Sequence, residues 1–296
     1  MMITGTQIQE LRGRTGMGIM LCKEALVATD GDLDGAIAYL RIKMGNKLTE
    51  LDPSTASEGV IAISLFPDFG SIAKLTCQTD FVAKNEDFVE FAYDIARAMG
   101  TCTFNADRAG NTCSVDDVVW GWDLSGPQST IKERITDLYG KFREPIALAD
   151  VRTMVNNGGE VISGYIHSTG KVGAIVKLAY QPSVGSDHDH IYDEIMKIGA
   201  SVGMQIVASK PKWISREEVP EGVTDQEVAI YRTQLLNEGK PEASFDRIMP
   251  GKLNKFYGEK CLLDQPYVRE PKKTVAQYLK DTGLNLTVVD FNLLSI

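Results

Sequence analysis

One nine-residue segment of this chain occurs twice, and this repeat is the strongest constraint on its fold. Residues 70–78 align with residues 173–181, and five of the nine positions are identical. Each copy follows a β-rich run and a glycine-containing turn, and each precedes a segment with helical periodicity. The spacing is too long for a solenoid repeat, so it predicts two related α+β subdomains.

Both copies are expected to have the same order of elements: strand, turn, strand and helix. In the first copy, apolar side chains recur on one stripe from Phe88 to Met99, which is typical of a helix packed on a sheet. The predicted strands are 60–65, 72–77, 161–167 and 172–180. One predicted helix begins near Asn85, and the other spans 189–208.

Residues 1–46 predict a small module of three short helices. Thr6 and Gln9 have the spacing of a capping box, and Asp32 precedes a third helix that we expect to end near Leu40. Three short helices bury little apolar area, so the module is expected to dock on another surface. Residues 47–57 are expected to form a linker.

The segment between the two copies is harder to interpret. Residues 101–128 contain two cysteines, two tryptophans and several glycines, and they predict an irregular excursion. Thr130 and Glu133 then have capping-box spacing, which predicts a helix over 130–142.

A helical hairpin is expected after the second copy. Residues 224–238, with Thr224 as the expected cap, and a second helix from residue 242 are joined by a Gly-Lys-Pro turn. Pro250 is expected to break or kink the second helix. Two interpretations of the hairpin remain equally open: a surface for a partner, or a solvated arm packed on the body. A short helix at 274–281 and a strand at 286–291 follow.

The predicted fold class is therefore α+β. It combines an N-terminal three-helix module, a core of two duplicated small antiparallel sheet/helix subdomains, and an inserted helical hairpin. The expected domain bounds are 1–46 for the module, 56–142 and 143–212 for the two core subdomains, with 262–296 completing the second, and 213–261 for the hairpin.

Composition excludes several classes of function. A net charge of -9 argues against a broad nucleic-acid surface, which needs a cationic footprint, so no direct nucleic-acid partner is expected. Apolar runs of the roughly 20 residues that a membrane span needs do not occur. Five cysteines without CxxC spacing favour free thiols in a reducing compartment, and a cytoplasmic location is expected.

The chain shows no recognised catalytic or nucleotide-binding motif, and neither a cofactor nor a metal is expected. His188 and His190 are better explained as solvated residues at the start of a helix than as metal ligands, because further ligands cannot be named. His167, at the end of a predicted strand, is either a histidine with satisfied hydrogen bonds or the base of a hydrolase. No nucleophile is placed beside it by sequence.

Four residues after the first repeat, Thr79-Asp80-Phe81-Val82, form an unusual connection. A loop is normally polar, so Phe81 either folds back into the core or is held out for a partner. The second copy has Pro182-Ser183-Val184-Gly185 there, without a large aromatic residue. From this contrast alone, the two interpretations remain equally open.

Several segments together resemble one family, elongation factor Ts, the guanine nucleotide exchange factor of translation elongation factor Tu. The resemblance spans nearly the whole chain, and the segment at 77–84 is its most specific part. The segments are residues 11–26, 77–84 (CQTDFVAK), 207–211 (VASKP), 239–241 (GKP), 255–259 (KFYGE) and 265–268 (QPYV), with Pro271, Thr274 and Val275 after them.

The resemblance implies a function in translation. It implies that the chain binds elongation factor Tu bound to GDP, inserts Asp80 and Phe81 beside the magnesium and phosphate site, and releases GDP without acting as an enzyme. The residues that it places at the contact are Thr79, Asp80, Phe81, Val82, Arg12, Ile19, Met20, Phe142 and His167. It also implies a possible homodimer through residues 213–261. An alternative function is a non-catalytic assembly subunit that holds the GTPase in a larger complex such as a polymerase.

Three positions depart from the family pattern. Ile19 replaces the usual methionine, a volume-conserving change that should be tolerated. Phe142 stands where an aliphatic contact residue is usual, so it is either a contact or a core residue. Pro250 lies within the second helix of the hairpin and puts the dimer surface in doubt.

Overall fold

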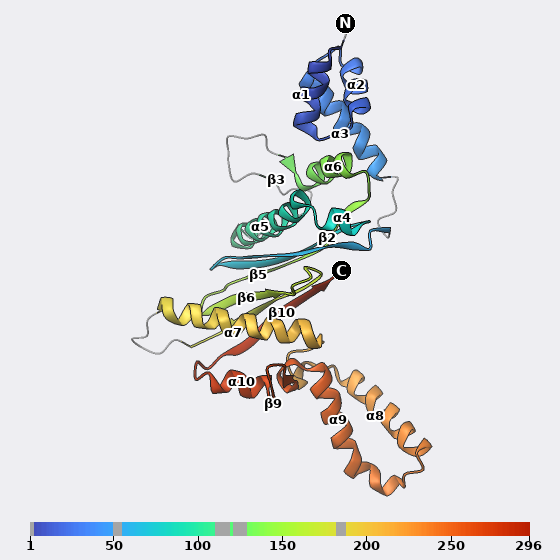
Figure 1. Ribbon diagram of the computed structural model, residues 1–296. Coiled ribbons are helices and arrows are strands. Elements are labelled where there is room, and N and C mark those ends of the chain that lie inside the picture. The colour runs from blue at the N-terminus through green and yellow to red at the C-terminus, as the bar shows by residue number, and fades with distance from the viewer. Residues whose placement is uncertain (1–2, 50–54, 110–118, 121–128, 182–187) are drawn as a thin grey trace.

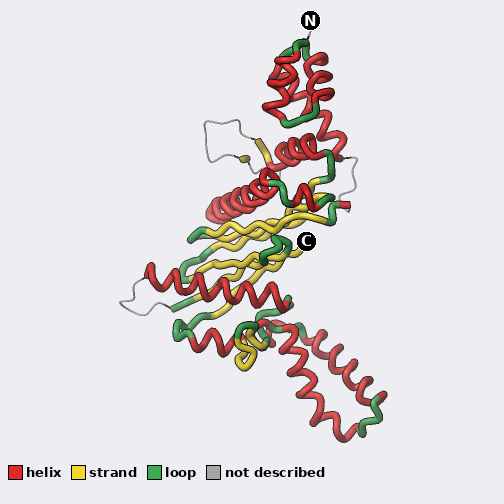
Figure 2. The backbone as a smooth tube through the Cα atoms, in the orientation of Figure 1, coloured by secondary structure: helices red, strands yellow, loops and turns green. Residues whose placement is uncertain are grey.

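The computed structural model describes residues 3–49, 55–109, 119–120, 129–181 and 188–296. The molecule is elongated, with the N-terminal helices at one end, a layered core in the middle and a two-helix arm at the other end (Figure 1). The C-terminus lies at the core. The predicted α+β class is confirmed, and Figure 2 shows strands gathered in the middle with helices outside them.

The N-terminal module consists of α1 (Gly5–Thr15), α2 (Ile19–Ala28) and α3 (Leu33–Thr49). The capping box of α1 is formed by Thr4 and Gln7, so the expected cap at Thr6 is wrong. Helix α3 continues past Leu40, because Met44 also enters the core of the module. The buried residues of this core are Leu11, Met17, Cys22, Ala25, Leu26, Ala36, Leu40 and Met44, together with Tyr139.

The first sheet has the strand order β1-β2-β5, with all neighbours antiparallel. Its strands are β1 (Glu58–Leu65), β2 (Phe69–Cys77) and β5 (Ile146–Val155). We expected residues 143–155 in the second core subdomain, but β5 hydrogen-bonds to β2 and completes the first sheet. The other predicted domain bounds stay predictions.

Helices cover the outer face of this sheet. They are α4 (Asp80–Ala83), α5 (Glu86–Ala109) and α6 (Ile131–Phe142), and α6 is capped by Thr130 and Glu133 as predicted. Residues 101–109 continue α5, so the expected irregular excursion is wrong there. A short hairpin of β3 (Val119–Trp120) and β4 (Ser129–Thr130) follows, and the rest of 110–128 lies outside the described residues.

The second sheet repeats this plan with the order β10-β7-β6. Its strands are β6 (Glu160–Ile166), β7 (Val172–Ala179) and β10 (Thr287–Ser295), and α7 (His188–Ser209) covers its outer face. In each sheet the repeated strand is central and the third strand lies on its far side. The contrasting segment 182–185 lies outside the described residues.

The register supports the duplication in detail. Val60 pairs with Leu75 in the first sheet, and Val161 pairs with the matching Leu178 in the second. Each third strand contains an irregularity at the same place, at the residue directly before an aspartate that lies opposite the repeated lysine. The register-defining pairs are Lys74–Asp150 and Leu75–Leu148 in one sheet, and Lys177–Asp290 and Leu178–Val288 in the other. A shared β-bulge is a specific feature, so the two sheets are related copies.

The two sheets pack face to face through a reciprocal contact. A Cβ on Gly70 would lie 2.4 Å from Ile162 Cγ2, and a Cβ on Gly173 would lie 2.9 Å from Ile61 Cγ2. Ile61 and Ile162 are themselves equivalent positions of the two copies, since each follows the valine that pairs with the repeated leucine. The repeated glycine therefore lets each copy accept an isoleucine of the other, and this gives four layers: helix, sheet, sheet, helix.

The arm is inserted between α7 and β10. It consists of α8 (Glu221–Asn237) and α9 (Phe245–Lys260), with short 3₁₀ turns at Arg216–Glu218, Glu242–Ser244 and Leu262–Asp264. Then follow β8 (Pro266–Tyr267), β9 (Glu270–Thr274) and α10 (Val275–Asp281). Helix α8 begins after Pro220, so the expected cap at Thr224 is wrong.

Pro250 lies inside α9 without breaking it, so the expectation of a break is wrong. The proline cannot donate to the carbonyl of Asp246 one turn earlier. Asp246 and Pro250 are both exposed, so water can satisfy that carbonyl.

Cysteine chemistry differs in part from the expectation. Cys22, Cys77 and Cys261 are buried free thiols. Cys102 is disulfide-bonded, so the expectation of free thiols throughout is wrong for this residue. Within the described residues, none of the helices has the length and apolar character needed to cross a bilayer.

Candidate functional site

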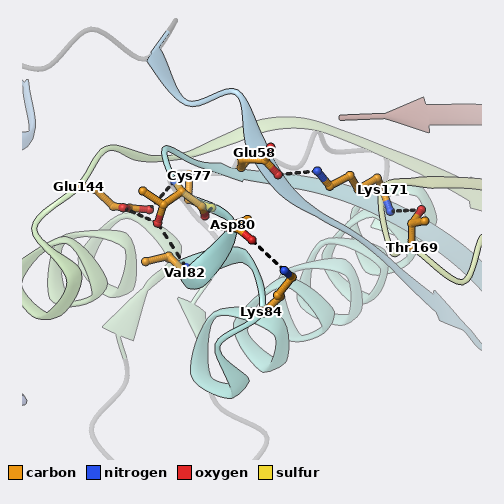
Figure 3. A network of polar contacts seen from close by, with 9 residues as sticks. Glu58, Cys77, Asp80, Val82, Lys84, Glu144, Thr169 and Lys171 are labelled. Atoms are coloured by element: carbon orange, nitrogen blue, oxygen red, sulfur yellow. Dashed lines mark hydrogen bonds and ion pairs between the residues drawn. The ribbon is translucent and has the colours of Figure 1, made fainter.

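The central strand of the first sheet ends in a tight turn that carries the singled-out residues. Strand β2 ends at Cys77, Thr79 is the N-cap of α4, and the four residues of α4 form a single helical turn (Figure 3). We call Thr79–Ala83 the tip. Because β2 is hydrogen-bonded to β1 on one side and to β5 on the other, the tip is mounted on a well-supported strand.

The side chains of the tip point in opposite directions. Phe81 is 84% exposed, whereas Val82 and Ala83 are buried in the core cluster under α5. The position of Phe81 agrees with the interpretation that it is held out for a partner. Its role in a contact stays a prediction, as do the roles of the other candidate residues.

Asp80 and Lys84 form an exposed ion pair one turn apart, with 2.7 Å between Oδ2 and Nζ. The hydrogen bond from Lys84 lowers the pKa of Asp80 below its usual value, and the charge of Lys84 adds to this effect. Asp80 therefore carries a negative charge at neutral pH, beside Phe81.

Glu144, a residue that the sequence did not single out, holds the base of the tip. Its Oε1 accepts hydrogen bonds from the backbone N–H of Gln78 at 3.2 Å and of Thr79 at 3.1 Å. Its Oε2 accepts one from the Thr79 hydroxyl at 2.9 Å. Glu144 is only 9% exposed, and it stands between the end of α6 and the start of β5. The only sequence signal was an acid placed directly before the apolar Pro145 and Ile146.

The end of β2 below the tip is buried. Burial raises the pKa of the Cys77 thiol to about 12, and the charges of Glu144 and Glu58 contribute to the rise. The thiol donates to the backbone oxygen of Thr79 at 3.3 Å. Cys77 is thus a packing residue and not a reactive nucleophile.

The turn between β6 and β7 lies beside the tip and carries His167. Lys171 of this turn pairs with Glu58 of β1 at 2.5 Å, and its charge also acts on Asp80 (Figure 3). The N–H of Ile61 donates to the carbonyl of Gly170 at 2.8 Å. The fold therefore brings His167 of the second copy to the same end of the core as the tip.

His167 itself is exposed. Its Nδ1 lies 2.9 Å from the Thr169 hydroxyl within the turn. An imidazole that is hydrogen-bonded within its own turn agrees with the interpretation of a satisfied histidine, and its exposure gives no support to a hydrolase.

The N-terminal candidates lie on a separate surface. Ile19 is 54% exposed and Met20 is 76% exposed at the start of α2, and Arg12 is exposed on α1. This module rests on α6: a Cβ on Gly140 would lie 2.3 Å from Met17 Cε, and Arg41 pairs with Asp137.

Phe142 differs from the other candidates. It is partly buried and packs against the first core cluster, with Lys141 Nζ 5.3 Å from its ring centre. This placement favours the core interpretation that the sequence left open.

A metal centre finds no support in the described part of the chain, where no group of three or more histidine, cysteine, aspartate or glutamate residues could hold an ion. His188 and His190 lie in the first turn of α7, but their side chains are outside what the structure describes. The tip, the β6–β7 turn and the start of α2 thus present exposed side chains on well-packed elements.

Comparison with known proteins agrees with the family suggested by the motifs. Residues 78–296 match the family model described as elongation factor TS. A protein named elongation factor Ts from Nautilia profundicola is 34% identical over 296 residues, which cover 98% of this chain and 91% of that protein. One from Clostridium botulinum (strain 657 / Type Ba4) is 32% identical over the same shares of the two chains.

Proposed function

The chain belongs to the elongation factor Ts family of translation elongation factors, and on this premise we propose that it binds GDP-bound elongation factor Tu and promotes GDP release. The observation that carries the proposal is Phe81, an aromatic side chain 84% exposed on a turn fixed to the core. Exposing an apolar side chain to water costs free energy, and contact with a partner removes this cost.

Three surfaces make up the proposed contact. The tip supplies Phe81 and Asp80, with Thr79 and Val82 as its anchors, and the neighbouring β6–β7 turn supplies His167. The module supplies Arg12, Ile19 and Met20. Phe142 contributes through the core beneath the tip, since it is partly buried there.

Exchange in this proposal is a linkage between two binding equilibria. The factor binds the nucleotide-free GTPase more tightly than the GDP-bound form, so it weakens GDP binding by the same factor. Each ~1.4 kcal/mol of coupling lowers GDP affinity tenfold. Phe81 acts as a wedge that disturbs the partner's magnesium and phosphate site, and Asp80 adds a negative charge beside it.

No bond is made or broken by this chain in the proposed role. Its residues bind the GTPase and weaken the binding of GDP to it, so the chain is an exchange factor and not an enzyme in the usual sense. It needs no cofactor of its own. We expect it to act in the cytoplasm, where its partner works.

Release of fluorescently labelled GDP from elongation factor Tu tests the proposal. Wild-type protein should accelerate release, and Phe81→Ala should lower the maximal rate by about 30-fold or more, as expected for a hot-spot aromatic residue worth 2 kcal/mol or more. The matched control is Tyr93→Ala, which removes another exposed aromatic side chain, on α5, and should leave the rate unchanged.

Two outcomes would contradict the proposal. Unchanged release by Phe81→Ala would exclude the wedge. Tight binding by wild-type protein without faster release would favour the assembly-subunit alternative.

The homodimer stays a separate prediction. Ile230 and Leu236 on α8 are 48% and 52% exposed and are the apolar side chains that a second copy would cover. Light scattering of the purified protein across concentration tests it, with monomers throughout as the contradicting result.

A further inference from the structure

We propose that Glu144 is a positioning residue whose buried carboxylate holds the tip in one conformation, so that Phe81 is presented to the partner in a fixed orientation. The effect on GDP release rests on the proposed function. The effect on the tip itself is a property of the free chain and can be measured without any partner.

The contacts of Glu144 converge on the two residues that lead into α4. One oxygen accepts the N–H groups of Gln78 and Thr79, and the other accepts the Thr79 hydroxyl. Thr79 Oγ1 in turn caps α4 by accepting the N–H of Val82. The chain of contacts thus runs from Glu144 through the hydroxyl into the helical turn that carries Phe81. Charge-assisted hydrogen bonds of this kind are stronger than neutral ones, and burial strengthens them further.

The tip needs such a holder because it is too short to be stable by itself. Helix α4 has four residues, and an isolated helix of this length does not form in water. Val82 and Ala83 fix its inner face by burial. Burial of two small side chains leaves the direction of the opposite face poorly defined, and the hydrogen bonds at the N-terminal side supply that direction.

Glu144 is itself held from both sides. Arg143, which precedes it, adopts a left-handed conformation with φ of 63° and ends α6, and its Nη1 lies 3.4 Å from Met44 Sδ of the module. Pro145 and Ile146 follow it as buried residues, and Ile146 begins β5. A carboxylate fixed by a helix end and a strand start has little freedom to move away from the tip.

Removing the carboxylate leaves two backbone donors without their acceptor at a partly buried site. Such a loss costs about 1–3 kcal/mol, which is enough to let the turn sample other conformations. A mobile wedge still meets the partner, because the other surfaces are unchanged, but it is correctly placed for a smaller fraction of the time. The maximal rate of GDP release should therefore fall more than the affinity does.

The experiment measures GDP release from elongation factor Tu against factor concentration for a set of variants. Glu144→Ala should lower the maximal rate about tenfold and change the half-saturating concentration less than about threefold. Glu144→Gln keeps one acceptor oxygen and should retain most of the rate. Thr79→Val should lower the rate and Thr79→Ser should restore it, since serine keeps the hydroxyl.

The matched control is Glu133→Ala. Glu133 also accepts a backbone N–H, that of the capping residue Thr130 at 2.8 Å, but it lies at the far end of α6. A general loss of stability would affect both variants, whereas loss of positioning affects only Glu144→Ala. Thr79→Val keeps the test valid if Glu144→Ala fails to fold, because it removes one hydroxyl and leaves the carboxylate in place.

Hydrogen exchange of the free protein gives a readout that needs no partner. The amides of Gln78 and Thr79 should exchange about tenfold faster in Glu144→Ala than in wild-type protein, in keeping with the lost hydrogen bonds. Unchanged amide exchange together with an unchanged maximal rate would overturn the inference. If wild-type protein fails to release GDP, the proposed function fails, and faster exchange at these amides would still support the role of Glu144.

Discussion

The tip and the N-terminal module both expose apolar side chains, but they are attached to the core in different ways. The tip continues a central strand and is held by partly buried hydrogen bonds to Glu144. The module rests on α6 through Met17, through Tyr139 of α6, which enters the core of the module, and through a partly exposed ion pair between Arg41 and Asp137. We expect the first attachment to fix the direction of the tip, and the second to fix mainly the position of the module.

Because the two surfaces are attached differently, we expect them to have different roles. A group that must distort its partner has to resist being pushed aside, so it belongs on the stiffer attachment. A group that only adds affinity tolerates more freedom. We therefore expect changes at the tip to act on the maximal rate, and changes at the module to act on the half-saturating concentration.

The largest expected effect concerns two buried thiols, one below each surface. Only the thiolate reacts with alkylating reagents, and a pKa of about 12 leaves Cys77 with about a thousandfold less thiolate at pH 8 than a thiol of pKa 9. Cys22 of the module also has a raised pKa, mainly through burial. We expect the module to detach from α6 more easily than the tip leaves the core, so Cys22 should be labelled first, as peptide mass spectrometry can determine. Equal labelling rates of Cys22 and Cys77 would contradict the proposed difference between the two attachments. A Cys77→Ser variant identifies the peptide signal that belongs to Cys77.

Met17→Ala tests the attachment of the module. Loss of this fully packed side chain should lower the free energy of unfolding of the module by about 2–5 kcal/mol, measured by denaturant titration. The half-saturating concentration for GDP release should rise while the maximal rate stays close to that of wild type. A fall in the maximal rate as large as that of Phe81→Ala would show that the two surfaces act as one.

Met20→Ala tests the surface of the module without disturbing its packing. The side chain is 76% exposed, so stability should not change. Loss of an apolar contact worth about 1.4 kcal/mol would raise the half-saturating concentration about tenfold. The clearest contradiction would be a lower maximal rate at saturating factor.

Arg41→Ala should have the smallest effect. Its guanidinium contacts both oxygens of Asp137, at 3.3 and 3.2 Å, but both side chains are partly exposed. Such a pair contributes at most about 1 kcal/mol, and high salt weakens it. The half-saturating concentration should rise at most about fivefold at low salt and approach the wild-type value near 1 M salt. An effect that persists at high salt would show that the ion pair is not what Arg41 contributes.

Local signals in the sequence predicted the elements that depend on local contacts. Thr130 and Glu133 cap α6 as their spacing indicated. The same signal failed at Thr6, because Thr4 and Gln7 have equal spacing and gain a further contact. Ile3 and Ile8, on either side of that cap, both pack against the core of the module as a hydrophobic staple does.

Features that depend on distant contacts were missed. Strand β5 was not predicted, because the irregularity at Ala149 shifts its alternation of apolar residues by one position. Glu144 was missed since its donors, Gln78 and Thr79, lie far away in sequence. Phe81 was the opposite case: the repeat made its exposure an open alternative, and the family motif favoured exposure.

The two ends of the arm meet where it joins the body. Trp213 and Cys261 form a bridge, the N–H of Lys212 donates to the carbonyl of Lys260, and the N–H of Leu262 donates to the carbonyl of Trp213. The chain therefore leaves and re-enters the body through neighbouring residues, and the ends of the insert stay closed whatever lies between them. Lengthening or shortening an insert of this kind changes its closure entropy only slowly. The length of the arm can therefore change while the geometry of tip and module is preserved.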